Sequence, residues 1–224
     1  MKYLIANWKA QTTLFEIDKW IETFKDQLAG DIKLTEKLAD NTVKIIICPP
    51  FPFILYVKNH FENISGIEVG AQDVSAFKEG KYTGEVTAKA LKDITNYSIV
   101  AHSERREHFQ ETEQEIEHKV SMCDQYNISP ILCIRNATDT VYSSVKIVAF
   151  EPVEAIGTGE NADVEYVLEM KKKVQLPEGA AYLYGGSADS KNINDYLKTG
   201  EIDGFLVGTA SLDPQEFYAM AREM

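Results

Sequence analysis

The sequence lacks an excess of basic residues and has no long hydrophobic run. Of its 224 residues, 23 are lysine or arginine and 35 are aspartate or glutamate, so the formal net charge is −12. A chain with this charge has no broad cationic field to hold a nucleic-acid backbone or an anionic membrane. We therefore expect no nucleic acid and no membrane as partners, and any phosphate that the protein binds must be held by a local site.

Cysteine is also scarce, and its pattern does not suit a disulfide framework. The three cysteines, Cys48, Cys123 and Cys133, are odd in number and lie in apolar surroundings, as buried reduced thiols do. No cluster of His, Cys and Asp has metal-ligand spacing, and no G-x-G-x-x-G motif follows an apolar run. We therefore expect no metal and no cofactor, which weakens metal-assisted and dehydrogenase interpretations.

Targeting and linker segments are not apparent either. The run from Met1 to Asn7 is short and leads directly into polar Lys9, without the apolar core of a signal peptide. No Pro-, Gly- or Ser-rich linker divides the chain, whose length and 44% apolar content allow one sizeable core. We expect a cytoplasmic protein with a single domain over residues 1–224.

Eight short apolar runs are candidate strands. Several are nearly continuous Val, Ile and Leu, which is typical of strands buried on both faces of a parallel sheet. Amphipathic stretches of helical period separate most of them, such as Ile116, Val120 and Cys123 opposite an acidic face. The runs are Tyr3 to Ala6, Val43 to Cys48, Ile67 to Ala71, Ser98 to Ala101, Pro130 to Ile134, Lys146 to Phe150, Ala181 to Tyr184 and Gly204 to Val207. The alternation predicts the α/β class and a closed (β/α)8 TIM barrel, with an open doubly wound sheet as the alternative.

Polar or glycine-rich segments follow five of these runs. In a parallel α/β fold, sites are built from the loops at the C-terminal ends of the strands. The segments are Asn7-Trp8-Lys9, His102-Ser103-Glu104-Arg105-Arg106, Glu151-Pro152, Gly185-Gly186-Ser187 and Gly208-Thr209-Ala210-Ser211. Together they would place a lysine, a histidine, a carboxylate and two glycine-rich turns at one rim of the barrel.

The residues at this rim are suited to phosphate binding and proton transfer. Glycine-rich turns before helices let backbone N–H groups approach an anion closely. Glu151 lies between an apolar run and Pro152, so it should be partly desolvated, which suits a general base. Singly, each residue is as well explained as a turn glycine, a surface lysine or a structural histidine. In combination, a base, a hydrogen-bond donor and a cation around a phosphate pocket are what removal of a proton next to a carbonyl requires.

A set of motifs also occurs in an order and spacing that resemble one known family. The motifs are Asn7-Trp8-Lys9, Cys48-Pro49-Pro50-Phe51-Pro52, Ala71-Gln72-Asp73, Thr83-Gly84-Glu85, Ala101-His102-Ser103-Glu104-Arg105-Arg106, Glu151-Pro152-Val153, Ile156-Gly157-Thr158-Gly159, Tyr184-Gly185-Gly186-Ser187 and Asp203-Gly204-Phe205-Leu206-Val207-Gly208. From residue 5 to about residue 212 the chain resembles triosephosphate isomerases, at the length of the compact archaeal members. The resemblance implies a cofactor-free isomerase that interconverts dihydroxyacetone phosphate and D-glyceraldehyde 3-phosphate through an enediolate, in glycolysis and gluconeogenesis.

The resemblance implies catalytic roles that are the established mechanism of that family. Glu151 would be the catalytic base, and His102 would be the neutral electrophile that hydrogen-bonds the substrate oxygens. Lys9 would supply positive charge to the phosphate and the enediolate. Ser103 and Glu104 would support these side chains.

The resemblance also implies how the substrate would be held. Asn7 would bind substrate oxygens. The phosphate would lie on backbone N–H groups of Gly157, Ser187, Gly208 and Thr209. A lid would close over it, formed by Pro152, Val153, Glu154, Ala155, Ile156, Gly157 and Thr158.

Some positions depart from the family pattern. The departures are Asp73 for an asparagine, Ala101 for a glycine, Arg135-Asn136 for Gly-Glu, Glu154 for a tryptophan and Thr209 for a glycine. Because these changes include the lid, a catalytically impaired barrel that binds phosphate or a partner is the alternative function.

The resemblance implies a homodimer formed through residues 78–85, with Thr83 reaching toward the neighbouring active site. The sequence adds that only about eleven residues separate the strand ending at Ile134 from the one beginning at Lys146, whereas a helical crossover needs a dozen or more. The helix there should be reduced to at most two turns, exposing Val141 and Tyr142. We expect two dimers to join across this wall into a tetramer, with the dimer as the minimum.

Overall fold

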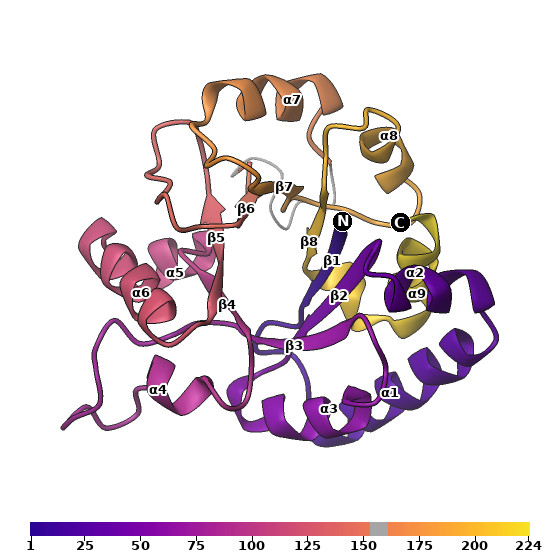
Figure 1. Ribbon diagram of the computed structural model, residues 1–224, viewed down its shortest axis with the longest axis horizontal. Coiled ribbons are helices and arrows are strands. Elements are labelled where there is room, and N and C mark those ends of the chain that lie inside the picture. Colours follow the sequence, from indigo (N-terminus) through magenta and orange to yellow (C-terminus); the bar gives the residue numbers. More distant parts are fainter. Residues whose placement is uncertain (153–160) are drawn as a thin grey trace.

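Eight parallel strands form a closed barrel in the computed structural model, which describes residues 1–152 and 161–224 (Figure 1). Each strand pairs with the next in sequence, and the last pairs with the first. The strands are β1 (Lys2–Asn7), β2 (Val43–Cys48), β3 (Ile67–Ala71), β4 (Tyr97–Val100), β5 (Ser129–Ile134), β6 (Ile147–Phe150), β7 (Ala181–Tyr184) and β8 (Gly204–Val207). They match the predicted runs to within one residue at each end, so the barrel is confirmed and the open sheet was the wrong alternative.

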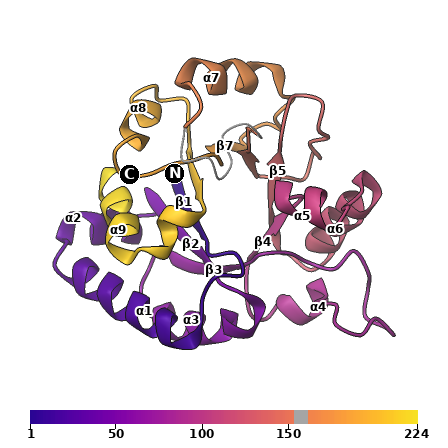
Figure 2. The ribbon, with the colours of Figure 1, turned by 180° about the vertical axis from the view of Figure 1, so that it is seen from behind.

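Helices surround the barrel (Figures 1 and 2). They are α1 (Leu14–Ala29), α2 (Ile32–Ala39), α3 (Ile54–Phe61), α4 (Ala88–Leu91), α5 (Ser103–His108), α6 (Glu113–Gln125), α7 (Val164–Lys173), α8 (Ile193–Leu197) and α9 (Pro214–Glu223), with the short 3-10 turns η1 (Phe51–Phe53) and η3 (Thr209–Leu212). None of the helices in the described part of the chain is both long and apolar enough to cross a lipid bilayer.

The strand side chains divide the core into two layers because successive residues of a strand face opposite ways. In β2, Ile46 and Cys48 point into the barrel interior, whereas Ile45 and Ile47 pack beneath the helices. Cys48, Cys123 and Cys133 all lie in the described part and are free, buried thiols, as predicted. Burial raises the pKa of Cys123 to about 12, so this thiol is unreactive.

The crossover between β5 and β6 contains no helix at all, although residues 135–146 are fully described. Even the remnant expected from the sequence is absent, and Figure 1 shows this side of the barrel covered by a loop. Val141 and Tyr142 belong to this loop and are half-buried, because they pack against the core. The bare apolar patch that we expected here is therefore largely covered by the loop itself.

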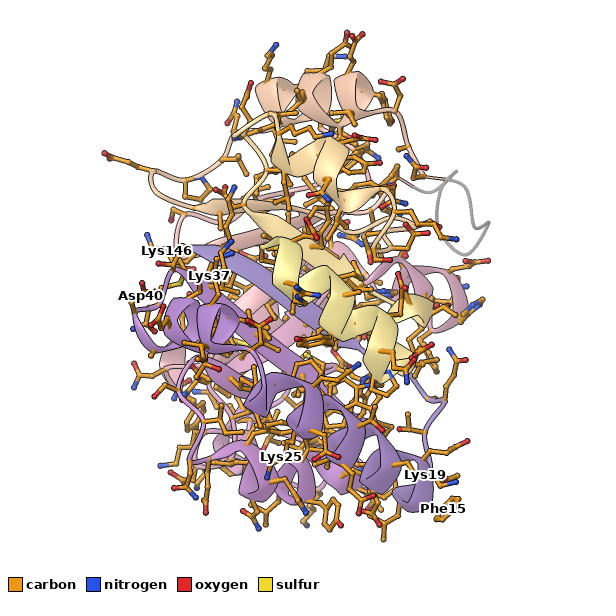
Figure 3. The ribbon with its side chains drawn as sticks, turned by 90° about the vertical axis from the view of Figure 1, so that its right-hand side faces the viewer. Phe15, Lys19, Lys25, Lys37, Asp40 and Lys146 are labelled. Atoms are coloured by element: carbon orange, nitrogen blue, oxygen red, sulfur yellow. The ribbon has the colours of Figure 1, made fainter. Side chains whose placement is uncertain are left out.

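All strands run in the same direction, so the barrel has two different ends. In Figure 3, Asp40 and Lys146, which precede β2 and β6, lie at one end, and Phe15, which follows β1, lies toward the other. The second end gathers the loops that follow the strands. This is the end at which the sequence places the candidate site.

Candidate active site

The C-terminal end of the barrel contains a cavity of about 280 Å³. Its walls come from the loops after β1, β4, β6, β7 and β8, which are the five loops singled out by the sequence. The lining residues are Asn7, Lys9, His102, Glu151, Gly185, Gly186, Ser187, Ala188, Asp189, Leu206, Gly208, Thr209 and Ala210. The structure thus brings the predicted base, electrophile, cation and glycine-rich turns to one cavity.

Glu151 and His102 are in direct contact at the base of this cavity. One carboxylate oxygen, Oε1, lies 2.9 Å from His102 Nε2, and the other, Oε2, accepts the backbone N–H of Ser103 at 2.8 Å. Only 1% of Glu151 is exposed, and a side chain at Gly185 would bring its Cβ to 3.0 Å from Glu151 Cγ. Glycine at position 185 therefore leaves room for the buried carboxylate.

The position of His102 at the start of α5 determines which ring nitrogen carries a proton. Nδ1 accepts the backbone N–H of Glu104 at 3.2 Å, so the proton of a neutral ring lies on Nε2, facing Glu151. Burial disfavours the charged ring, but the Glu151 carboxylate outweighs burial and raises the pKa of His102 above its ordinary value. The raised pKa thus depends on the contact with Glu151.

Lys9 is held at the cavity by an unusual backbone conformation. Its φ is 51°, in the left-handed region, and its N–H donates to Asn7 Oδ1 at 3.1 Å. Its Nζ lies 2.5 Å from Glu104 Oε1, and Gly208 lies so close that a Cβ there would be 3.3 Å from Lys9 Cε. The lysine ammonium is therefore fixed between the start of α5 and the turn after β8.

The sequence assigned no role at the site to Gln72 or Cys133, nor to the cavity-lining residues Ala188, Asp189 and Leu206. Gln72 Nε2 donates to the carbonyl oxygens of Lys9 and Cys48, both at 2.9 Å, and so supports the strained lysine. Burial and the charge of Glu151 raise the pKa of the Cys133 thiol well above its ordinary range. The available signal for Gln72 and Cys133 was a polar or thiol side chain at the end of a buried strand.

The turn after β8 is tied to the outer helices. Within η3, the backbone N–H and the hydroxyl of Ser211 both donate to the Gly208 carbonyl, at 2.9 and 2.7 Å. The carbonyl of Ser211 accepts the indole N–H of Trp20, from α1, at 2.9 Å. Helix α1, near the start of the chain, thus helps to hold the turn after β8, which we expect to bind phosphate.

The predicted lid falls mostly on residues that the structure does not describe. Pro152 is described and buried beside Glu151. Val153, Glu154, Ala155, Ile156, Gly157 and Thr158 lie outside the described residues. The lid and the Gly157 contact therefore remain expectations from the sequence.

This geometry defines a class of protein. A buried carboxylate and histidine in contact, with a lysine and glycine-rich turns at the C-terminal end of a barrel, form the site of an acid–base enzyme of the α/β-barrel class.

Comparison with known proteins identifies the family within this class. A family model for triosephosphate isomerase matches residues 2–224. The triosephosphate isomerase of Dictyoglomus turgidum is 36% identical over 255 residues, which cover 99% of this chain and 98% of the relative. Those of Aquifex aeolicus and Mesomycoplasma hyopneumoniae (strain 7448) are 35% and 34% identical, each with 96% of both chains covered. The chain belongs to the triosephosphate isomerase family.

Proposed function

We propose that Glu151 is the base, His102 the electrophile and Lys9 the cation with which this triosephosphate isomerase interconverts dihydroxyacetone phosphate and D-glyceraldehyde 3-phosphate. The observation that carries this proposal is the buried contact of 2.9 Å between Glu151 and His102, in a cavity that Lys9 also lines. The impaired-barrel alternative gains no support, because all three side chains line the same cavity. As a glycolytic and gluconeogenic enzyme, the protein would act in the cytoplasm.

In the proposed reaction, substrate separates His102 from Glu151, and each side chain then acts on a different part of the substrate. Substrate entering the cavity would take over the Nε2–H of His102 with its carbonyl oxygen, which frees Glu151 Oε1 to remove a proton from the adjacent carbon. Separation from Glu151 also removes the main cause of the raised His102 pKa, while burial continues to lower it, so the ring would serve as a neutral donor. His102 would then hydrogen-bond the enediolate oxygens while Glu151 returns the proton to the neighbouring carbon.

Lys9 and the glycine-rich turns would hold the charged parts of the substrate. The ammonium of Lys9, beside Gly208, can contact both the phosphate and the developing enediolate charge. Backbone N–H groups at Ser187, Gly208 and Thr209 would bind the phosphate, with Asn7 binding substrate oxygens. Ser103 and Glu104 support the site through their contacts with Glu151 and Lys9.

An isomerase assay of purified protein tests the proposal, with each triose phosphate as substrate in turn. We expect Glu151→Gln to fold normally and to lose about 10²- to 10⁴-fold in kcat, as loss of a general base does. Glu107→Gln is the matched control, because Glu107 lies exposed on α5 and its change removes the same charge. If folded Glu151→Gln retains about a third of parental kcat, far above the general-base range, Glu151 is not the base.

For assembly, we propose a homo-oligomer with a dimer as the minimum, formed through the loop between β3 and α4. Exposed aromatic side chains at the end of this loop support the dimer. The tetramer has weaker support, because Val141 and Tyr142 already pack against the core.

A further inference from the structure

The crossover between β5 and β6 contains a buried carboxylate that the proposed reaction does not use. Asp139 has a side chain that is only 5% exposed. Its Oδ2 accepts the backbone N–H of Arg135 at 2.7 Å, and the Arg135 guanidinium donates to both carboxylate oxygens at 3.0 and 2.8 Å. Burial opposes ionisation, but the hydrogen bonds from Arg135 outweigh it and lower the Asp139 pKa. Asp139 is thus an anion that hydrogen bonds fix in place within the loop.

A second arginine connects Asp139 to the backbone before His102. Arg106, on α5, has a side chain that is 6% exposed, and its Nη2 lies 4.0 Å from Asp139 Oδ2. Its Nε donates to the carbonyl oxygen of Ala101 at 3.2 Å. Ala101 directly precedes His102 and has a φ of 64°, a conformation that needs support from its surroundings. Arg106 supplies that support from one side.

The first arginine connects Asp139 to the backbone of Glu151. Arg135 directly follows Ile134, the last residue of β5, and the Ile134 carbonyl accepts the Glu151 N–H at 2.7 Å. In a barrel crossover with a helix, backbone hydrogen bonds would organise the chain after β5. Here the Asp139 carboxylate organises this segment instead, because it accepts the backbone N–H of Arg135.

We propose that Asp139 is a positioning residue for the isomerisation. It holds the backbone at Ala101 through Arg106 and the end of β5 through Arg135, and so fixes the positions of His102 and Glu151 relative to each other, in the contact of the free enzyme and when substrate separates them. This inference rests on the proposed function. Its physical basis is that proton transfer depends steeply on sub-ångström placement of the base and the donor. Asp139 contacts neither reacting group, so it acts only through the two arginines.

The first test is the kinetics of Asp139→Asn, which keeps the shape of the side chain and removes its charge. We expect kcat to fall about tenfold, because misplacement by around an ångström costs up to about 10²-fold. KM and the inhibition constant of inorganic phosphate should stay near the parental values, because the phosphate turns are on other strands. Asp139→Glu, which retains the charge, should recover part of the loss.

The matched control is Glu113→Gln. Glu113 pairs with Nη1 of Arg106 from the solvent side, with 54% of its side chain exposed, so its change removes the same charge from the same guanidinium. We expect its kcat to stay at the parental value. Arg106→Gln provides a second route if Asp139→Asn does not fold, since it breaks the link to Ala101 while leaving the Asp139–Arg135 pair. It should lower kcat without changing KM.

The second test follows the His102 ring by NMR titration and does not depend on catalysis. Glu151, Glu104 and Lys9 face the ring in every variant, and contact with Glu151 raises the His102 pKa. If Asp139 fixes this contact, Asp139→Asn should lower that pKa, and Glu113→Gln should not. A folded Asp139→Asn protein with parental kcat and parental His102 titration would overturn the proposal, as would equal effects of the two variants. Absence of isomerase activity in the parent would instead refute the proposed function, and the titration would still decide the role of Asp139.

Discussion

At the scale of single residues, the orientation of the His102 ring determines how it can serve the reaction. The N–H of Glu104 occupies Nδ1, so Nε2 is the nitrogen that faces Glu151 and the cavity. The Lys9 ammonium forms an ion pair with the Glu104 carboxylate. These contacts make His102 a donor and Lys9 a fixed cation, which leads to a kinetic prediction.

We expect His102→Gln and Lys9→Met each to lower kcat/KM by about 10²-fold or more, as loss of a group that stabilises an oxyanion does. Lys9→Met should also raise KM, because the lysine contacts the turn that would bind phosphate. Steady-state kinetics, with circular dichroism to verify folding, checks both. Near-parental kinetics in two well-folded variants would leave the enediolate without its assigned stabilisers.

Ala101 provides a second prediction at this scale. Its φ of 64° is a left-handed conformation, which costs a residue with a Cβ about 1–2 kcal/mol. Glycine removes this cost but loses about 0.5–1 kcal/mol through the greater freedom of the unfolded chain. We therefore expect Ala101→Gly to raise the free energy of unfolding by up to about 1.5 kcal/mol in urea denaturation. Ala90→Gly, at an exposed position of α4, should lower it by about 0.5–1 kcal/mol, and equal signs for the two would refute strain at Ala101.

At the scale of elements, the strands were predictable from the sequence and the short helices were not. Strands such as Val43–Cys48 are buried on both faces, so their continuous apolar runs mark their ends to within one residue. Helices such as α5 and α8 are too short to show a helical period, and tertiary contacts stabilise them. The loop length after β5 predicted a shortened helix, but it did not predict that the crossover would contain no helix.

The candidate site divides in the same way. Residues that follow a strand directly, such as Lys9, His102 and Glu151, could be assigned to one rim because parallel strands end together. The supporting contacts could not, since they join side chains far apart in sequence. Gln72 reaches back to Lys9, and Trp20 reaches a residue 191 positions away. Their partners depend on the closed barrel rather than on any local pattern.

The contact from Trp20 to the turn after β8 gives a prediction for these elements. Trp20→Phe keeps an aromatic ring in α1 but leaves the Ser211 carbonyl without its indole donor. We expect the free energy of unfolding to fall by about 1–3 kcal/mol. KM and the inhibition constant of inorganic phosphate should rise while kcat changes little, because the lost contact supports binding rather than proton transfer.

The control for stability is Trp8→Phe. Trp8 packs edge-on against Trp20 with ring centroids 4.9 Å apart, and its indole N–H has no hydrogen-bond partner among the residues that the structure describes. Trp8→Phe therefore removes a similar ring volume to Trp20→Phe, but it removes no hydrogen bond. If both variants are destabilised equally, the Trp20 contact with Ser211 contributes no more than packing.

At the scale of the whole molecule, the loop between β3 and α4 stands apart from an otherwise closed barrel. It projects beyond the ring of helices in both ribbon views (Figures 1 and 2). Ser75 closes its base, since its N–H donates to the Val86 carbonyl at 2.9 Å and its hydroxyl donates to Glu85. The loop is therefore a built projection that carries its outer residues away from the core.

The end of this loop exposes apolar rings to solvent. Exposed rings do not aid solubility, so they indicate a surface that another molecule covers. Phe77 and Tyr82 are 45% and 46% exposed and stack with ring centroids 4.4 Å apart. A pre-stacked pair loses little conformational entropy when it is buried, so it is suited to contact a second copy of the chain. We expect light scattering on a size-exclusion column to give at least about twice 25.2 kDa.

The variant Tyr82→Asp should shift this protein to the monomer, because a carboxylate cannot be buried in the stack without a partner. Ile32→Asp is the control, since Ile32 is exposed on α2, which leads into the end of the barrel opposite the candidate site, and it should leave the mass unchanged. If residues near Thr83 complete a neighbouring site, kcat should fall together with the dimer.

A parent mass of 25.2 kDa at all concentrations would refute the assembly, whereas a mass of about four chains would favour the tetramer across the β5–β6 wall. In that case Tyr142→Asp should reduce four chains to two, because it changes the wall and leaves the loop contact intact.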